Sequence, residues 1–375
     1  MKVRLGDVAT YINGYAFKPE DWSDSGLPII RIQDLTGNSY KTNRFSGKYD
    51  KKFEVNDGDI LISWSASIGV YIWRGEKAIL NQHIFKVKFD KQVNICKKFF
   101  IYQVENILKK AILETHGATM KHLTKPVFDS LPFYLPDIKK QNEISAILDK
   151  ISEIISLRQQ QLKKLDELVK SRFIEQIGTI KDTKFKITEL ESLCEFIKDG
   201  THQTPTYTDD KIHGFKFLSS KDVTTRKISW NKVKYITPDL HKQLYSVIAP
   251  KRGDILLAKN GTIGYAAVVD NDEIFDIYVS LALLRPKKEN DVYYLWAAIN
   301  NNETKAQFIS SLKGIGVPNL HLREIKKTKI IVPPIDIQRE FSYFITQTNK
   351  SKLEIQKSLD KLEILKKSLM QQYFG

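Results

Sequence analysis

Few residues in this chain have the types and spacing that catalysis requires. Two segments have a nuclease-like spacing, Asp182-Thr-Lys184 and Glu303-Thr-Lys305, but spacings of this kind also arise by chance. An adenine methylase needs an Asn/Asp-Pro-Pro-aromatic motif to hold a flipped base, whereas Pro333-Pro334 is flanked by apolar residues on both sides. The sequence lacks a G-x-x-x-x-G-K-[ST] phosphate loop, and its seven histidines lack metal-ligand spacing. We therefore expect a binding protein with no catalytic residue, metal or cofactor of its own.

A repeated polar turn is the first candidate for binding. Residues 58–69 read GDILISWSASIG and residues 253–264 read GDILLAKNGTIG, so six of the twelve positions are identical. Gly-Asp, an apolar run and a closing glycine predict a strand, a turn and a second strand. The turn side chains differ between the copies, as expected where a fixed framework presents variable contacts to bases or phosphates. These candidates are Trp64, Ser65 and Ser67 in the first copy and Lys259, Asn260 and Thr262 in the second. The alternative is that all six are ordinary turn residues.

Three further polar clusters are candidates for the same role. Residues 117–122 and 314–321 occupy the same place in the two copies, just before the apolar run that precedes a long helix. Residues 199–205 form a small polar loop in the second copy only. The alternative is that these clusters are solvated turns. The side chains that we expect to contact a phosphate backbone are Lys121, His122, His202 and His321.

We predict a long helix over residues 136–178, and this helix would hold the turns in position. The segment has no internal proline or glycine, Asp137 is a suitable N-cap, and Gly178 is a suitable C-terminal stop. Its apolar residues recur at alternating steps of four and three, which is a heptad seam rather than the broader face of an ordinary surface helix. At 1.5 Å per residue the helix would be about 55–60 Å long. The seam consists of Ile144, Leu148, Ile151, Ile155, Leu162 and Leu165.

The same pattern returns 197 residues later. Pro136, Gln141 and Glu143 correspond to Pro333, Gln338 and Glu340. We therefore infer an internal duplication, in which the two helices pair antiparallel about a pseudo-twofold axis and bury both seams. The second seam consists of Ile345, Ile355, Leu359 and Leu362.

The globular segments that precede the helices also repeat. Residues 1–135 contain β-type runs at 28–32, 60–64, 70–73 and 84–89 and a helical pattern at 94–113. We predict four parts: a first domain at 1–135, a long helix at 136–178, a second domain at 179–335 and a second long helix at 336–375. The expected class is α+β, with two mixed α/β domains separated by an antiparallel two-helix coiled coil.

Composition favours a polyanionic partner. The chain has 59 Lys and Arg against 44 Asp and Glu, a net charge of +15 over 375 residues. Such an excess is typical of nucleic-acid binding proteins. No apolar run is long enough to cross a membrane, the N-terminal segment does not read as a signal peptide, and Cys96 and Cys194 lack metal or redox spacing. We therefore expect a cytoplasmic protein with two reduced thiols and no membrane partner.

The duplicated order of these motifs resembles the specificity subunit of Type I restriction–modification systems. The resemblance rests on the G-D-I-L blocks, the Pro-x4-Gln-x-Glu helix starts and the two L-x-x-L-x-x-S helix tails, and it covers the whole chain. It implies two target-recognition domains, each of which reads half of a split sequence in double-stranded DNA. It further implies two methylase subunits and motor-nuclease subunits as partners, with S-adenosylmethionine, ATP and Mg on those partners and no catalysis by this chain.

Other interpretations remain open at this point. The chain could be a non-catalytic coiled-coil adaptor whose basic surface is incidental, or the specificity subunit of a related methylase or nuclease system. A third interpretation is a nuclease or methylase with degenerate motifs. DNA affinity that depends on sequence would argue against the adaptor, and methylation by the purified chain alone would favour the enzyme.

Overall fold

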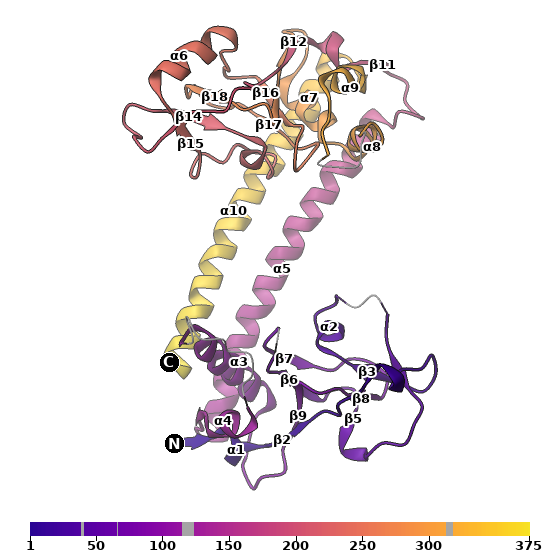
Figure 1. Ribbon diagram of the computed structural model, residues 1–375, viewed down its shortest axis with the longest axis vertical. Helices are drawn as coiled ribbons and strands as arrows, with labels where there is room; N and C mark the ends of the chain where they lie inside the picture. The colour runs from indigo at the N-terminus through magenta and orange to yellow at the C-terminus, as the bar shows by residue number, and fades with distance from the viewer. Residues whose placement is uncertain (39–40, 66, 115–123, 313–317) are drawn as a thin grey trace. The chain divides into compact units, whose positions relative to one another are not determined.

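The structure of the protein is a computed structural model that describes residues 1–38, 41–65, 67–114, 124–312 and 318–375 (Figure 1). The chain divides into two compact units. Unit 1 comprises residues 1–159 and 358–375, and unit 2 comprises residues 160–357. Each unit therefore contains one globular part and one end of each long helix.

Unit 1 has two four-stranded sheets. The first is antiparallel in the order β2-β9-β6-β7, and the second has the order β4-β3-β8-β5, with β3 and β8 parallel. A short antiparallel pair, β1 with β10, joins the two ends of the globular part. The strands are β1 (Lys2–Arg4), β2 (Thr10–Asn13), β3 (Leu27–Ile30), β4 (Arg44–Phe45), β5 (Glu54–Val55), β6 (Ile60–Ser63), β7 (Gly69–Ile72), β8 (Ala78–Leu80), β9 (Ile84–Lys88) and β10 (Pro132–Tyr134). The helices are α1 (Leu5–Val8), η1 (Pro19–Asp21), α2 (Ile32–Leu35), η2 (Lys51–Phe53), α3 (Lys97–Glu114) and α4 (Lys125–Ser130).

Unit 2 repeats this plan with local changes. Its antiparallel sheet has the order β12-β19-β16-β17, its second sheet has the order β13-β15-β14-β18 with β14 and β18 parallel, and β11 pairs with β20. The strands are β11 (Lys186–Glu189), β12 (Cys194–Asp199), β13 (Tyr207–Thr208), β14 (Phe215–Leu218), β15 (Lys234–Ile236), β16 (Ile255–Ala258), β17 (Ala266–Val268), β18 (Phe275–Ile277), β19 (Leu281–Pro286) and β20 (Lys329–Val332). The helices are η3 (Leu190–Leu193), η4 (Ser220–Asp222), α6 (Pro238–Val247), α7 (Val292–Ile299), α8 (Asn302–Ser310) and α9 (Leu322–Lys327).

The equivalent orders of the two antiparallel sheets and the parallel pairs β3–β8 and β14–β18 confirm the predicted mixed α+β class and the internal duplication. The fourth strand of the second sheet, however, joins opposite edges in the two units. All four predicted β-type runs of the first copy correspond to strands, with bounds that differ by one or two residues. The unpredicted helices α2 and η4 follow equivalent strands. In each, an aspartate, Asp34 or Asp222, accepts a hydrogen bond at 2.8 Å from the backbone N–H three residues before it.

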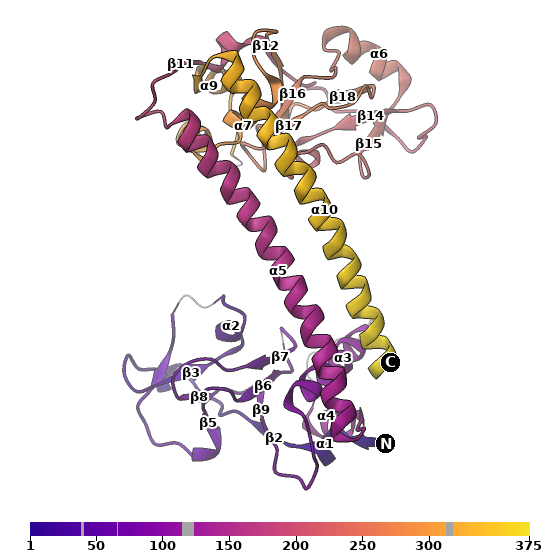
Figure 2. The same ribbon diagram turned by 180° about the vertical axis from the view of Figure 1, so that it is seen from behind.

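The two long helices are α5 (Ile138–Ile177) and α10 (Ile335–Phe374), each of 40 residues (Figure 2). Asp137 caps α5, since its Oδ1 accepts a hydrogen bond from the Lys140 N–H at 2.9 Å. Gly178 follows α5 with φ of +93°, the left-handed conformation that commonly ends a helix. None of the described helices is both long enough and apolar enough to span a bilayer.

The ends of the long helices belong to the cores of the units. In unit 1, Ile144 and Leu148 of α5 share a buried cluster with Met370 of α10. In unit 2, the rings of Phe173 (α5) and Phe341 (α10) lie 5.4 Å apart, edge to face. The start of one helix thus packs with the end of the other in each unit, so the pairing is antiparallel.

The remaining seam positions are less buried. Leu359, Ile151 and Ile345 are 6%, 8% and 1% exposed, whereas the predicted seam residues of the central turns are only half-buried: Ile155, Leu162, Leu165, Ile355 and Leu362. Near them, Lys352 pairs with Asp166 across the two helices of unit 2. The ends of both long helices pack into the globular cores, so each compact unit combines a globular part with helix ends.

Candidate nucleic-acid interface

The repeated G-D-I-L blocks build the same hairpin start in each unit. Gly58 and Gly253 adopt φ of +87° and +91°, and a Cβ at either position would meet nothing within 4 Å. Glycine is therefore favoured here by backbone conformation and not by crowding. The aspartate that follows, Asp59 or Asp254, accepts a hydrogen bond at 2.9 Å from the backbone N–H three residues before it.

Asp254 also anchors the unit 2 hairpin. It is 1% exposed, and Arg285 donates hydrogen bonds to it from Nε and Nη2, both at 2.8 Å. These hydrogen bonds raise the pKa of Arg285 above its ordinary value. The paired charges fix the hairpin to the neighbouring strand β19.

Trp64 and Lys259 occupy the same backbone position. The Trp64 N–H donates to the carbonyl of His83 at 3.3 Å, and the Lys259 N–H donates to the carbonyl of Ser280 at 3.0 Å. The two carbonyl residues are 197 positions apart, the same separation as the two long helices. One framework therefore presents a different side chain in each unit.

Lys259 does not have the exposed position that a phosphate contact requires. It is 4% exposed, and its Nζ lies 3.0 Å from Asp199 Oδ1. Its place in the turn suggested a phosphate contact or an ordinary turn residue, because neither the strand pattern nor the turn shows a partner 60 residues earlier in the chain. We correct that expectation: Lys259 is the buried half of an ion pair.

Trp64 is half-buried and packs into the unit 1 core. Its ring stacks on the ring of Phe85, with centroids 5.7 Å apart, and lies edge to face with the ring of His83, with centroids 4.9 Å apart. Ser65 is half-buried, whereas Ser67 is exposed. Of these three predicted contacts, Ser67 is the side chain already open to solvent.

Unit 2 brings all three of its predicted polar segments together. Asn260 bridges to Asn319 of the 314–321 segment, and the Leu320 N–H donates to the Lys259 carbonyl at 2.8 Å. From the third segment, His202 is 73% exposed and its Nε2 lies 3.5 Å from Asp199 Oδ2. The 199–205 and 253–264 segments and residues 318–321 therefore form one polar surface around the Lys259–Asp199 pair.

The side chains on this surface differ in their accessibility. The amide oxygens of Asn260 and Asn319 are buried without a hydrogen-bond partner among the described residues. Thr262 and His321 are exposed, and His321 stands at the N-cap of α9. The predicted contacts Lys121 and His122 lie outside the described residues.

The sequence analysis missed a repeated glycine at the edge of each first sheet. A Cβ on Gly14 would lie 2.0 Å from the Asn81 carbonyl oxygen, and one on Gly200 would lie 2.4 Å from that of Ile277. Neither position tolerates a side chain. A register shift in β12 between Cys194 and Phe196 adds one residue, which obscured the correspondence when the sequences were aligned without a gap.

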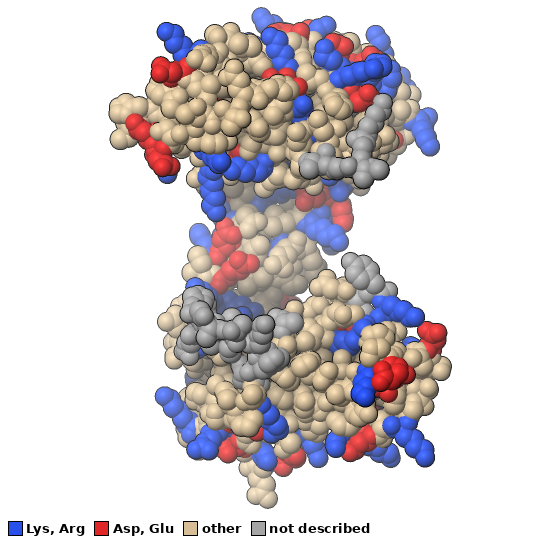
Figure 3. Space-filling model, viewed as in Figure 1, with Lys and Arg blue, Asp and Glu red and all other residues tan. Residues whose placement is uncertain are grey.

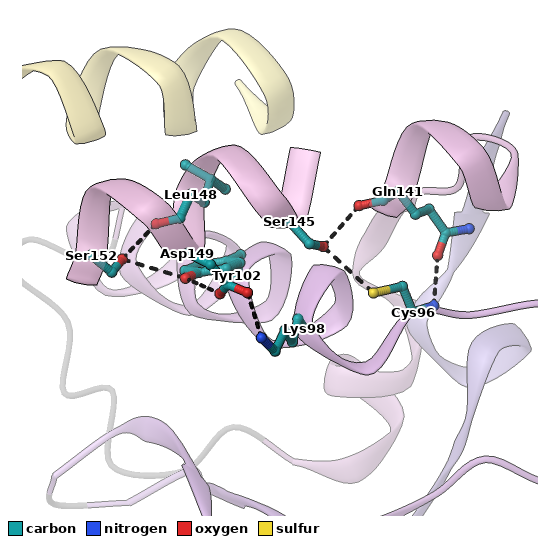
Figure 4. Close-up of polar contacts among 8 residues, drawn as sticks. All are labelled: Cys96, Lys98, Tyr102, Gln141, Ser145, Leu148, Asp149 and Ser152. Carbon is teal, nitrogen blue, oxygen red and sulfur yellow. Dashed lines mark hydrogen bonds and ion pairs between the residues drawn. The ribbon is translucent and has the colours of Figure 1, made fainter. Parts of the chain in front are cut away.

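The repeated glutamine at each helix start is a buried polar anchor, and Figure 4 shows the first of the two, Gln141. Gln141 Oε1 accepts a hydrogen bond from the Cys96 N–H at 2.9 Å, and its Nε2 donates to the carbonyls of Asn94 and Pro136 at 3.1 and 2.9 Å. Gln338 repeats this role, accepting from the Asp291 N–H at 2.9 Å. These bonds tie each long helix to the globular part of its unit.

Charge is distributed over both units. Figure 3 shows Lys and Arg side chains spread across the face drawn of each unit, with Asp and Glu among them. In the part of the chain that the structure describes, no group of three His, Cys, Asp or Glu residues is placed to hold a metal ion. The site is therefore a set of hydrogen-bond donors, acceptors and cations on a rigid framework.

The sequence matches the family described as "Type I restriction modification DNA specificity domain" over residues 1–167 and again over 182–365. It is 23% identical over 370 residues to the Type I restriction enzyme EcoBI specificity subunit of Escherichia coli, covering 91% of this chain and 77% of that protein. It is 25% identical over 394 residues to the Type I restriction enzyme MjaVIII specificity subunit of Methanocaldococcus jannaschii, covering 98% and 90%.

Two solved structures share the fold. A chain from a study of complex assembly and conformational transition of the type I R-M system matches with a TM-score of 0.61 at 14% identity, covering 100% of this chain and 97% of that one. The S subunit of the Type-I restriction-modification system from M. genitalium matches with a TM-score of 0.53 at 14% identity, covering 100% and 96%. The likeness extends over both units.

Proposed function

Because this chain belongs to the Type I restriction–modification DNA specificity family, we propose that it reads a split target in double-stranded DNA, one half per globular part. Residues 1–135 are the first recognition domain and residues 179–335 the second. The chain supplies recognition and no chemistry, while methylase and motor-nuclease subunits bring S-adenosylmethionine, ATP and Mg.

One observation carries this proposal: the equivalent turns of the two units expose different side chains, Ser67 in unit 1 and Thr262 in unit 2. The framework residues around them repeat, including the Gly-Asp pair and the glycines that approach a carbonyl. A duplicated scaffold with divergent side chains on equivalent turns is what two readers of different sequences require, since phosphate contacts position a protein while base contacts specify. The net charge of +15 supports a polyanionic partner.

Exposed apolar side chains on the long helices support the docking of protein subunits. On α10, Tyr343 and Ile364 are each 68% exposed, and on α5, Ile174 is 56% exposed. Large apolar residues on helices otherwise rich in charge suit a protein interface better than a solvated surface. We propose that two methylase subunits bind this chain through its long helices.

A domain exchange tests divided recognition. Residues 1–135 are replaced by the corresponding domain of a relative with a known target, and methylated adenines are mapped in cells that carry the matching methylase. One half of the target should change and the other should remain. The matched control replaces residues 179–335 instead and should alter the opposite half.

Two results would contradict the proposal. A single exchange that changes both halves together would show that the domains do not read independently. Methylation of an unchanged site after either exchange would show that this chain does not select the target.

A further inference from the structure

Unit 2 contains an open groove, and none of the predicted contact residues lines it. It has a volume of about 680 Å³ and lies between the loop after η4, the end of β17, α7 and α10. Trp230, Trp296 and Tyr293 contribute aromatic faces, and Tyr293 is 42% exposed. The groove therefore has the size and wall chemistry of a ligand site.

The groove is basic. Arg226, Lys227 and Lys350 line it, against one acidic residue, Asp270. Among the residues that the structure describes, these three cations make no ion pair, whereas Lys259 and Arg285 of the same unit do. Unpaired positive charge in a hollow attracts an anionic partner.

Arg226 has a backbone conformation that its side chain disfavours. Its φ is +61°, and only two non-glycine residues of the described chain have positive φ. In unit 1 the turn after α2 also has a positive-φ residue, Gly37 at +72°, but one position earlier relative to the preceding aspartate. A glycine would fit the turn in unit 2 without strain, so the arginine is explained by its side chain rather than by the turn.

Arg226 also lies where two hollows meet. Together with Trp296 and Asn349, it lines a second, smaller cavity of about 180 Å³ between α5, α7 and α10. Trp296 is held in place, since its Nε1 donates to the Ala266 carbonyl at 2.8 Å. The guanidinium thus stands beside a fixed aromatic wall, with donors that match the oxygens of a phosphate.

We propose that this groove binds the phosphodiester backbone of duplex DNA, with Arg226 as its central contact. The proposal rests on the proposed DNA-reading function and extends it to a surface that positions the duplex without reading bases. Lys227 and Lys350 supply flanking charge. The contact is independent of sequence, because phosphates are alike at every base pair.

The test uses the full chain purified together with its methylase subunits and a labelled duplex that carries its methylated target. Affinity is measured at several salt concentrations for wild type, Arg226→Gly and the exposed Lys288→Ala as control. Glycine suits positive φ, so Arg226→Gly should fold with an unchanged or higher melting temperature. We expect its affinity to fall roughly tenfold for matched and half-site-mutated duplexes alike. The slope of log affinity against log salt should fall by about one unit.

Arg226→Lys separates charge from shape and should recover most of the salt slope. Affinity and slope equal to wild type in Arg226→Gly, with half-site preference retained, would overturn the groove while leaving the proposed function intact. A wild-type complex without half-site preference would instead overturn the proposed function. Loss of the methylase subunits from Arg226→Gly with unchanged DNA affinity would also overturn the inference, by assigning the groove to a protein contact.

Discussion

Lys259 Nζ lies 3.0 Å from Asp199 Oδ1, and their side chains are 5% and 18% exposed. The pair joins the start of the β16–β17 turn to the end of β12, and the exposed His202 reaches the other oxygen of Asp199. Two segments that sequence reasoning treated as separate DNA contacts are therefore one electrostatic unit.

Breaking this pair should destabilise unit 2. Lys259→Ala leaves the Asp199 carboxylate nearly buried without its cation, and we expect a loss of about 3–5 kcal/mol in the free energy of unfolding. The combined Lys259→Met and Asp199→Asn variant should recover much of that loss, because neither charge remains. Denaturant unfolding of all variants measures the coupling. Additive losses in the double variant would contradict a direct interaction.

Asn260 and Thr262 should influence only one half of the target. If Asn260 reaches a base edge, Asn260→Ala should cost roughly 1–3 kcal/mol in binding the preferred sequence and relax one half-site. Thr262→Ala should act on the same half-site, and Ser67→Ala at the equivalent position of unit 1 should affect the other half. Titrations on duplexes with either half mutated distinguish the outcomes. Equal effects of one variant on both halves would exclude base reading by this turn.

Substitutions along the helix seam should differ in their cost to stability, because the seam residues differ in burial. Leu148 is fully buried and Leu162 only half-buried, so Leu148→Ala should cost about 2–5 kcal/mol and Leu162→Ala clearly less. Leu165→Asp should also destabilise the protein less than a charge at a fully buried position would, because Leu165 is half-buried and the new carboxylate can reach water. Thermal melting ranks the three variants. A larger loss for Leu162→Ala than for Leu148→Ala would contradict this order.

Gln141 and Gln338 should be intolerant of apolar replacement. Gln141→Leu leaves the Cys96 N–H without its acceptor and the Asn94 carbonyl without its donor. Each buried group left unsatisfied should lower the free energy of unfolding by about 1–3 kcal/mol. Gln141→Glu keeps the acceptor but sets a buried carboxylate oxygen against the Asn94 and Pro136 carbonyls, so it should cost at least as much. The neighbouring exposed Asn142→Leu serves as a control. Melting temperatures that fall equally for Asn142→Leu and Gln141→Leu would argue against an anchoring role.

Asp276 should contribute a pH dependence to the stability of unit 2. It is 2% exposed, and its Oδ2 lies 2.7 Å from His241 Nδ1. Burial raises the pKa of Asp276 above its ordinary value, and His241 opposes that rise. A raised carboxyl pKa means that the folded state holds the proton more tightly than the unfolded state. Its stabilisation is therefore present below the unfolded pKa of about 3.9 and is lost as pH rises through the folded pKa.

Asp276→Asn removes this titration and serves as the reference. The stability of wild type relative to Asp276→Asn should fall as pH rises from about 4 towards 7. Unfolding free energies at several pH values give the difference directly. A difference that is flat, or that rises with pH, would contradict a raised pKa.

Sequence alone was sufficient for the local and repeated features. Heptad spacing and the Asp137 and Gly178 signals predicted the long helices to within two residues, because helical periodicity and capping depend on neighbours in the chain. The G-D-I-L blocks predicted the strand–turn–strand units for the same reason, since glycine conformations and turn hydrogen bonds are local. Duplication at a fixed separation indicated the second copy without any structure.

Tertiary structure decided which side chains are free to bind. Lys259 reads as an exposed turn lysine until β12 brings Asp199 beside it, and Trp64 reads as a polar-turn residue until Phe85 and His83 cover its ring. Arg226 shows no signal in sequence, because its significance arises from a backbone angle and from walls contributed by α7 and α10. Burial and ion pairing depend on residues distant in the chain, so the framework could be predicted while its accessible contacts could not.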